Sequence, residues 1–251
     1  MGINRRSGNG SMVRSWVLNI KFVAMGVGIK KAGIFYTNNL LPTEILMASL
    51  DSIKKASEKH GVEVLTSSWE PLPYFENHIC DIKDKGHLSL YYQILGLLFK
   101  LRERDVEVVS FLEHDTIYGE DYFSFNSIDG NHDMFEGDVL ANRNYIGITG
   151  EGYVTRPVVN PLHQLTMKLD YAIEYFSKEL IGTIEKPVSI VEPNVRYSYW
   201  DSMQKSIHVN WGGNFTSHYQ TFGDVYSDTD EYWGDSKDLI NKSLFREVTY
   251  K

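Results

Sequence analysis

One cysteine, Cys80, is present among the 251 residues of the chain. A single thiol excludes an intrachain disulfide and a metal cluster held by several thiolates. An isolated cysteine is typical of a small, half-buried apolar residue. The composition therefore favours a reducing compartment and predicts a cytoplasmic protein.

Positive charge is also scarce. Lys and Arg total 25 against 33 Asp and Glu, which gives a formal net charge of −8. No basic block stands out beyond Arg5, Arg6 and Arg14. Affinity for duplex nucleic acid depends largely on neutralising phosphates. The charge balance therefore argues against a duplex partner, and only weakly against a short or single-stranded one.

Long apolar runs are missing as well. The most apolar N-terminal stretch, 16–29, is interrupted by Asn19 and Lys21 and is too short to span a bilayer. No small-x-small cleavage site follows it, so a signal peptide is not favoured. We expect residues 1–24 to be disordered or outside the fold, a single domain over 25–222, and an acidic, aromatic tail or flap over 223–251.

The rest of the chain alternates between two periodicities. Apolar runs that end in polar residues, at 33–39, 62–68 and 106–112, predict buried strands. Residues 43–59, closed by Gly61, and residues 88–99 carry apolar side chains at helical spacing. This alternation predicts an α/β fold with a Rossmann-like, mostly parallel sheet covered by helices on both faces.

Polar clusters follow each of the three predicted strands. They are Thr37-Asn38-Asn39, Thr66-Ser67-Ser68 and Glu113-His114-Asp115. Ligands of open parallel sheets bind outside the carboxyl ends of the strands. We therefore expect the three clusters to meet at one edge of the sheet. The middle residue, His114, is expected to point away from its acidic neighbours, and the later pair Glu120 and Asp121 to lie on a loop surface.

A helix containing YYQIL, followed by an apolar strand that ends in an acid-x-acid triplet, resembles the nucleotide-sugar-dependent glycosyltransferases of the GT-A fold. Their triplet is written DxD, and Glu113 replaces the first Asp here. The resemblance covers roughly residues 33–220. It implies a metal-dependent enzyme that transfers a sugar from a nucleotide-diphosphate donor to a glycan, a small molecule or a modified nucleobase.

The resemblance also implies roles for the two acids. Mn²⁺ or Mg²⁺ bridging the two phosphates of the donor would stabilise the leaving group. In the family pattern, Asp115 ligates the metal directly and Glu113 holds metal-bound water or the ribose. One or two carboxylates suffice because these ions keep several positions for water and phosphate.

Family members often add a late metal ligand, commonly a histidine. Residues 206–219, SIHVNWGGNFTSHY, resemble a late segment of some bacterial and phage glycosyltransferases. We rank His208 first and His218 second as metal or phosphate contacts, and an imidazole ligand mildly favours Mn²⁺. A packed structural histidine is an equal alternative. The segment Gly212-Gly213-Asn214 either brings backbone amides to a phosphate or forms a tight turn.

Further residues are expected at the donor and acceptor. Thr37, Asn38 and Asn39 suit a base and ribose, and Gln93 interrupts an otherwise apolar helix surface near them. Residues 142–157 are predicted to form a strand followed by a Gly-rich loop, and 160–180 a long helix. Glu151, in that loop, lies where inverting members of the family place a catalytic base, and Glu192 is a second candidate.

Two alternative functions remain open from the sequence. GNHD at 130–133 matches one element of metallophosphoesterases, so a hydrolase centred on His132 and Asp133 is one alternative, although the other elements of such a site are missing. The aromatic residues of 223–251 suggest a carbohydrate-binding protein without catalysis as the other. DTDEYWGD at 228–235 begins like a calcium loop, but it lacks the glycine and glutamate that an EF-hand requires.

Overall fold

The structure of the chain is a computed structural model. It describes residues 29–84, 86–125, 138–149, 152–154, 161–185, 195, 197–209, 225–226, 229–230 and 234–235. Six predicted site residues lie outside the described residues: Glu151, Glu192, Gly212, Gly213, Asn214 and His218. The GNHD segment at 130–133, residues 1–24 and most of 223–251 also lie outside them.

The first half of the chain alternates strands and helices as predicted. Its elements are β1 Lys31–Thr37, α1 Thr43–His60, β2 Glu63–Ser68, β3 Glu76–Ile79, α2 His87–Arg102 and β4 Val108–Glu113. Helix α1 ends at Gly61, whose φ of 62° is the left-handed conformation that glycine adopts without a Cβ penalty. Only the short edge strand β3, in an irregular stretch of sequence, was not predicted.

The second half contains mostly short strands. Its elements are β5 Thr116–Ile117, β6 Val139–Asn142, β7 Tyr145–Thr149, β8 Gly152–Val154, the 3₁₀ helix η1 Leu162–Gln164, β9 Leu165–Lys168, α3 Leu169–Glu185, β10 Ser198–Trp200, β11 Ser206–Val209, β12 Val225–Tyr226, β13 Thr229–Asp230 and β14 Gly234–Asp235. Strands β7 and β8 pair as an antiparallel hairpin, where the sequence predicted a strand and a loop.

The main sheet has seven strands in the order β10-β6-β9-β4-β1-β2-β3. Strands β4, β1, β2 and β3 are parallel to one another, and β10 is parallel to β6. Strand β9 is antiparallel to both of its neighbours, β4 and β6. The predicted α/β fold with a mostly parallel sheet is confirmed.

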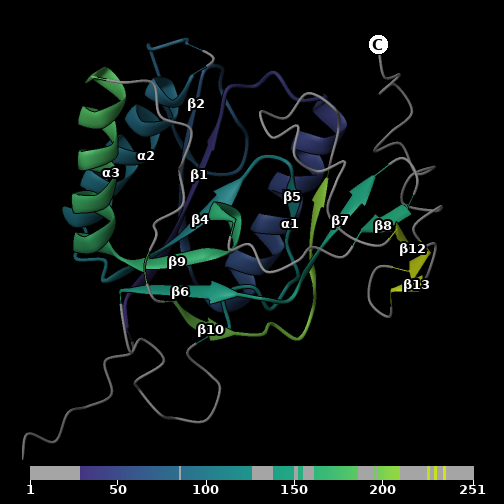
Figure 1. Cartoon of the computed structure of the whole chain (residues 1–251). Coiled ribbons are helices and arrows are strands. Elements are labelled where there is room, and N and C mark those ends of the chain that lie inside the picture. Colours follow the sequence, from purple (N-terminus) through teal and green to yellow (C-terminus); the bar gives the residue numbers. More distant parts are fainter. Residues whose placement is uncertain are drawn as a thin grey trace, which may run out of the picture.

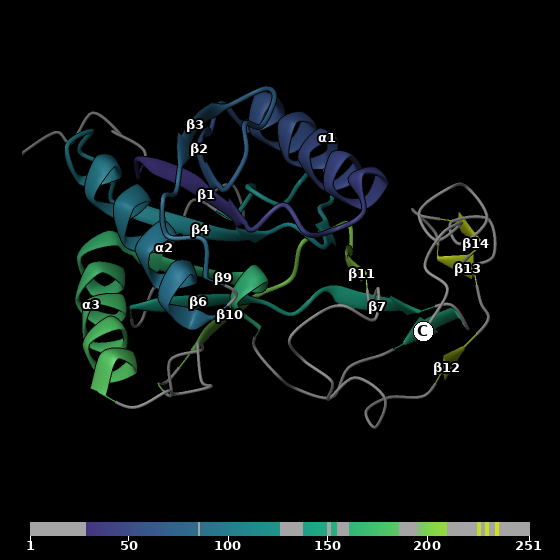
Figure 2. The same cartoon turned by 90° about the horizontal axis from the view of Figure 1, so that it is seen from above.

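Helices cover both faces of this sheet. Figure 2 shows α1 over one face and α2 with α3 over the other, and the element order can be followed in Figure 1. Residues of α1 pack with Phe35 and Leu112 in one buried cluster, and residues of α2 and α3 pack with Ile34 and Phe111 in a second. Alternate residues of β1 and β4 therefore face opposite layers, as expected for strands buried on both sides.

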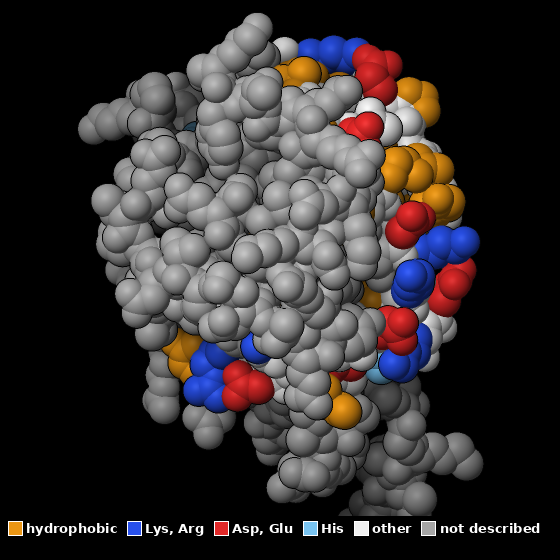
Figure 3. Space-filling model, turned by 90° about the vertical axis from the view of Figure 1, so that its right-hand side faces the viewer, with side chains coloured by type: hydrophobic (Ala, Val, Ile, Leu, Met, Phe, Trp, Pro, Cys, Tyr) orange, Lys and Arg blue, Asp and Glu red, His pale blue; other side chains and the backbone are white. Residues whose placement is uncertain are grey.

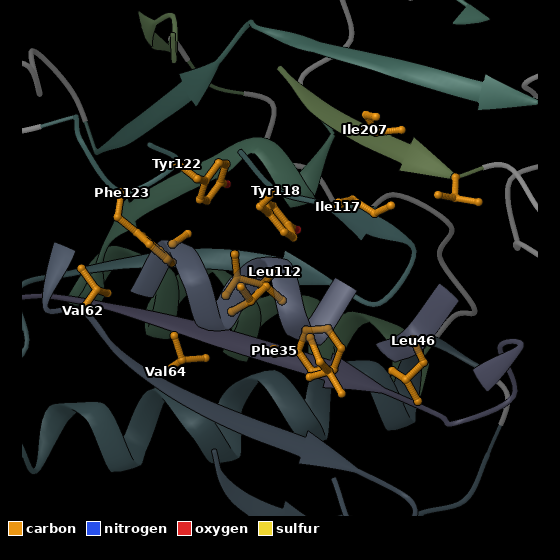
Figure 4. Packing of buried hydrophobic residues seen from close by; sticks show 14 of the residues in the cluster. Phe35, Leu46, Val62, Val64, Leu112, Ile117, Tyr118, Tyr122, Phe123 and Ile207 are labelled. Atoms are coloured by element: carbon orange, nitrogen blue, oxygen red, sulfur yellow. The ribbon is translucent and has the colours of Figure 1, made fainter. Parts of the chain in front are cut away.

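A second sheet packs on the α1 side. Its order is β12-β8-β7-β11-β5. Ile117 and Ile207 from this sheet lie in the same buried cluster as Leu112 and Phe35, and Figure 4 shows Tyr118 and Tyr122 between the two sheets. Because Ile207 faces this core, His208 points to the opposite face of β11.

The structure corrects the helix predicted over 160–180. Its first half is η1 and the strand β9, and the helix begins only at Leu169. The leucines at 162, 165 and 169 have helical spacing, but Leu165 and Met167 are fully buried within the main sheet. Hydrogen bonding to strands on both edges outweighs the helical pattern there.

Two smaller expectations are also wrong. Tyr92 and Phe99 belong to the helical pattern over 88–99, which predicts a buried apolar stripe, but they are 44% and 48% exposed. Asp121 was assigned to a loop surface, but it is buried and accepts hydrogen bonds from the backbone N–H groups of Met203 and Gln204. Backbone groups from a distant segment make this burial favourable, and local sequence does not reveal them.

The described surface is mixed in charge. On the face in Figure 3, described Asp and Glu side chains lie beside Lys and Arg side chains along the margin, with apolar side chains between them. The described part of that face therefore carries no large patch of one sign. None of the described helices combines the length and apolarity that a bilayer-spanning segment needs.

Candidate metal and nucleotide site

The ends of β1 and β4 lie side by side at the carboxyl edge of the main sheet. Tyr36 and Glu113 are paired in register, and the Tyr36 hydroxyl donates to Oε1 of Glu113 at 3.4 Å. Thr37 Oγ1 lies 2.7 Å from Nδ1 of His114. Two of the three predicted polar clusters are therefore in direct contact, and His114 points to Thr37 as its own partner.

The third cluster has a structural role. Thr66 and Ser68, which end β2, both donate to Oδ1 of Asn77 in the neighbouring strand. Asn39 accepts hydrogen bonds from the N–H groups of Trp69 and Glu70 through its Oδ1, and its own backbone has a φ of 56°. These contacts tie the loop after β1 to the loop after β2.

Gln93 supports the end of β1 from helix α2. Its Oε1 accepts the backbone N–H of Thr37 at 3.1 Å, and its Nε2 donates to Ser89 Oγ at 3.2 Å. Gln93 is 5% exposed, so both hydrogen bonds are buried. A polar residue in an apolar helix surface thus fixes Thr37, and its predicted contact with a nucleotide stays a prediction.

A cavity of about 280 Å³ opens beside Gln93, between α2 and the edge strand β3. Its lining includes Ser67, Tyr92, Gly96 and Lys100. It therefore offers a hydroxyl, an aromatic ring and an ammonium group next to the carboxyl edge. Its volume lies just below the range of about 300–1,000 Å³ that is usual for small-molecule sites.

The acid-x-acid triplet is fixed by a tight connection between β4 and β5. The N–H of Glu113 donates to the Tyr118 hydroxyl at 2.8 Å, and Ser49 of α1 donates to the carbonyl of Thr116 at 2.7 Å. The Glu113 side chain is 28% exposed, whereas Asp115 is buried. Of the two acids, Glu113 is the one that solvent and ligands can reach.

His163 is the functional candidate that the sequence did not reveal. Its Nδ1 lies 3.0 Å from Oε2 of Glu113, and the residue is 1% exposed. The Tyr122 hydroxyl donates to its carbonyl at 2.9 Å, and the Tyr145 ring meets its ring edge-on. His163 was missed because its segment was read as the buried face of a long helix.

His208 completes the group from the second sheet. Its ring stacks on that of His163, with centroids 4.9 Å apart and planes 19° apart, and its Nε2 lies 3.4 Å from Oδ2 of Asp115. One potential ligand atom from each of Glu113, His163 and His208 lies within 4.8 Å of the other two. A carboxylate with two imidazoles is a donor set that suits divalent transition metals.

The electrostatics of the site keep the Asp115 carboxylate charged next to the His208 imidazole. Burial alone would raise the pKa of Asp115, but the charge and hydrogen bond of His208, together with His114 and His163, outweigh burial and lower it below the usual range. Burial raises the pKa of Tyr118 well above its ordinary value, and the nearby Tyr122 adds to this. Tyr118 therefore remains a neutral phenol next to Glu113.

The structure thus brings Thr37, Gln93, Glu113, Asp115 and His208 together at one edge of the sheet, and adds His163. Asn38 and Asn39 follow β1 at the same edge, and Asn39 is occupied in holding the next loop. The roles that the sequence assigned to all of these residues stay predictions.

No protein-family model matches the chain, and no curated protein matches it in sequence. Solved structures similar to it include a glycosyltransferase involved in the glycosylation of the major capsid of PBCV-1, with 11% identity and a TM-score of 0.44 over 75% of this chain and 95% of that one. Another is S. aureus TarS 1–349, with 14% identity and a TM-score of 0.45 over 72% of this chain and 60% of that one. The same fragment in complex with UDP-GlcNAc has 13% identity and a TM-score of 0.45, over 76% and 61%. Likeness at this level does not establish a shared activity.

Proposed function

We propose that this chain is a metal-dependent glycosyltransferase, which transfers a sugar from a nucleotide-diphosphate donor to a glycan, a small molecule or a modified nucleobase. One observation supports this function above all: Glu113, His163 and His208 form a potential metal site beside Thr37, at the carboxyl edge of a mostly parallel sheet. Ligands of such sheets bind at that edge.

The donor nucleotide has candidate contacts at the end of β1 and in the adjoining cavity. Thr37 and Asn38 would hold the base and ribose, with Gln93 fixing the Thr37 backbone and Asn39 holding the loop beside them. The adjoining cavity, with the Tyr92 ring in its wall, has room for part of a nucleoside. The amides of Gly212 and Gly213, with the side chain of Asn214, are proposed to bind a phosphate.

The metal group serves the leaving diphosphate. When bound, Mn²⁺ or Mg²⁺ supplies a Lewis acid that stabilises the negative charge on the phosphates. Glu113, Asp115 and His208 would form its surroundings, and His218 is a further proposed contact. Tyr118 and Ser49 keep this segment in place through hydrogen bonds to its backbone.

An inverting transfer needs a base at the acceptor. In such a transfer, an acceptor oxygen bonds to the anomeric carbon while the bond from that carbon to the phosphate oxygen breaks. The acceptor proton passes to a carboxylate, for which Glu151 and Glu192 are the proposed candidates. The nucleoside diphosphate leaves with the electron pair of the broken bond.

Thermal unfolding with Mn²⁺ and a panel of nucleoside diphosphates tests this function. We expect an increase in Tm that requires both ligands together, because a ligand that binds only the native state stabilises it. Mass spectrometry should then detect nucleoside diphosphate released from a nucleotide sugar. Stabilisation by free sugar alone would instead support a carbohydrate-binding protein, and hydrolysis of a phosphomonoester would support the hydrolase alternative.

A further inference from the structure

We infer that Glu113, His163 and His208 bind the metal directly and that Asp115 acts through His208, so that the site prefers Mn²⁺ or Co²⁺ to Mg²⁺. This assignment deepens the proposed function and rests on it for the role of the metal. It reverses the roles that the DxD resemblance implies for the two acids. It also brings in His163, which no motif in the sequence indicated.

The positions of the two acids support the reversal. Glu113 belongs to the group whose ligand atoms lie within 4.8 Å of one another, and its side chain is 28% exposed. Substrate phosphates and water need open positions on a catalytic metal. Glu113 is therefore placed to contact an ion that a substrate also reaches, whereas Asp115 is 6% exposed and lies deeper.

Asp115 is aimed at an imidazole. Its Oδ2 lies 3.4 Å from Nε2 of His208, and its carbonyl accepts the N–H of Val209, the residue after His208, at 2.7 Å. A metal-bound histidine usually donates its other ring N–H to a carboxylate, which fixes the tautomer and the orientation of the ring. Asp115 holds both the ring and the backbone of the strand that carries His208. It is a positioning residue in this assignment.

Two buried tyrosines hold the backbone of the other two proposed ligands, Glu113 and His163. The Tyr118 hydroxyl accepts the N–H of Glu113, and the Tyr122 hydroxyl donates to the carbonyl of His163. The two rings contact each other with centroids 4.6 Å apart, and both residues are buried. Ligands from β4 and η1 are thereby held by one packed pair of side chains, which is the kind of support that a preformed metal site requires.

The donor set selects the class of ion. Mg²⁺ prefers oxygen ligands and binds imidazole poorly, whereas imidazole nitrogen suits later first-row ions, whose affinity rises from Mn²⁺ to Co²⁺. Two imidazoles and one carboxylate therefore favour Mn²⁺ and Co²⁺ over Mg²⁺. This preference belongs to the protein alone and needs no nucleotide.

Calorimetric titration of the metal-free protein with Mn²⁺, Co²⁺ and Mg²⁺, without nucleotide, tests the assignment. We expect Mn²⁺ and Co²⁺ to bind at least about tenfold more tightly than Mg²⁺. Glu113→Gln and His163→Gln should lose Mn²⁺ binding. Asp115→Asn keeps an acceptor for the His208 ring and should weaken binding by only about 10–100-fold.

Spin-echo spectroscopy of the Mn²⁺ complexes counts the bound imidazoles. We expect two in the wild type and in Asp115→Asn, and at most one in any complex that His163→Gln still forms at high Mn²⁺ concentration. His78→Gln is the matched control, because Nε2 of His78 contacts Oε1 of Glu76 at 3.1 Å in a similar pair outside the group of potential ligands. This control should bind Mn²⁺ like the wild type.

Two results would overturn the assignment: unchanged Mn²⁺ affinity in His163→Gln, or loss of one imidazole signal in Asp115→Asn while its fold is intact by circular dichroism. Should Glu113→Gln and His163→Gln fail to fold, the imidazole count and the ion preference of the wild type still decide the question. Metal binding as described without turnover of any nucleotide sugar would reject the proposed transferase and keep the metal site. Turnover in excess EDTA, with no bound Mn²⁺, would reject the metal site and keep a transferase.

Discussion

The imidazole rings of His163 and His208 stack on each other, with centroids 4.9 Å apart and planes nearly parallel, although His163 lies in η1, just before β9 of the main sheet, and His208 lies in β11 of the second sheet. Each ring has its own carboxylate, Glu113 for His163 and Asp115 for His208. If both rings carried a proton, these carboxylates would offset the repulsion between the two cations.

Acid should remove the contribution of Asp115 to stability. Its pKa is lowered in the folded chain, so the charged form stabilises the fold above the ordinary aspartate pKa of about 3.9, and this contribution is lost as the pH falls through the folded value. We expect Asp115→Asn to lower the free energy of unfolding by on the order of a few kcal/mol at pH 6, with the difference from wild type shrinking below about pH 4.

Urea unfolding in EDTA at several pH values measures this difference. Below pH 5 the histidines are protonated in the unfolded chain, and other carboxylates titrate alike in both proteins. Asp84→Asn, at an exposed position, serves as the control and should follow the wild type. A constant difference between wild type and Asp115→Asn from pH 6 to pH 2 would contradict the prediction.

Tyr122→Phe should destabilise the protein and weaken the metal site. The variant keeps the buried ring but leaves the His163 carbonyl without the hydroxyl that donates to it. We expect a loss of about 1–3 kcal/mol in the free energy of unfolding, measured with urea, together with weaker Mn²⁺ binding. Tyr92→Phe, which alters an exposed ring, should change neither quantity. Equal behaviour of the two variants would rule out a supporting role for Tyr122.

Gln93→Leu should disturb the end of β1. The substitution keeps the volume of a buried side chain but removes the oxygen that accepts the Thr37 N–H. An orphaned buried N–H costs about 1–3 kcal/mol, and the Thr37 backbone should move. Urea unfolding and titration with a nucleoside diphosphate measure the two effects. Arg102→Leu, at an exposed position of the same helix, should change neither the free energy of unfolding nor the nucleotide affinity. A nucleotide affinity equal to wild type in Gln93→Leu would show that this end of β1 is not part of the nucleotide site.

Two glycine substitutions should have opposite signs. A Cβ at Gly33 would lie 2.8 Å from Leu112 Cδ1 and 3.2 Å from Val64 Cγ2, so Gly33→Ala should destabilise the protein by about 1–3 kcal/mol. A Cβ at Gly96, in α2, would meet nothing within 4 Å, so Gly96→Ala should stabilise it by about 0.5–1 kcal/mol. Thermal unfolding measures both. The same sign for both variants would contradict the packing described for β1.

The first half of the fold was predictable because its signals are local. Periodicity marks α1 and α2, Gly61 marks a helix end, and polar residues mark where β1 and β4 leave the core. The general rule for ligand sites then placed Thr37 and Glu113 at one edge, and the structure shows them there. The burial of Asp121 and the exposure of Phe99 depend on distant packing partners, which local periodicity does not contain.

The site was half predictable for the same reason. Glu113, Asp115 and His208 stood out as polar residues next to apolar runs. His163 sits between Leu162 and Leu165, whose spacing continues into a true helix, and nothing in the segment separates a buried strand from a helix face. Pro161, just before η1, fits the start of the predicted helix equally well and so does not reveal the strand.

The reversed direction of β9 determines which of its flanking residues lie at the ligand edge. Strands β1 and β4 deliver residues to the ligand edge as they finish, but β9 runs the other way, so the chain is already at that edge when β9 starts. His163 therefore reaches the site from the entrance of a strand. In a sheet that contains one reversed strand, the residues that precede that strand in the sequence lie at the same edge as the residues that follow its parallel neighbours. Both sets are equally well placed for chemistry.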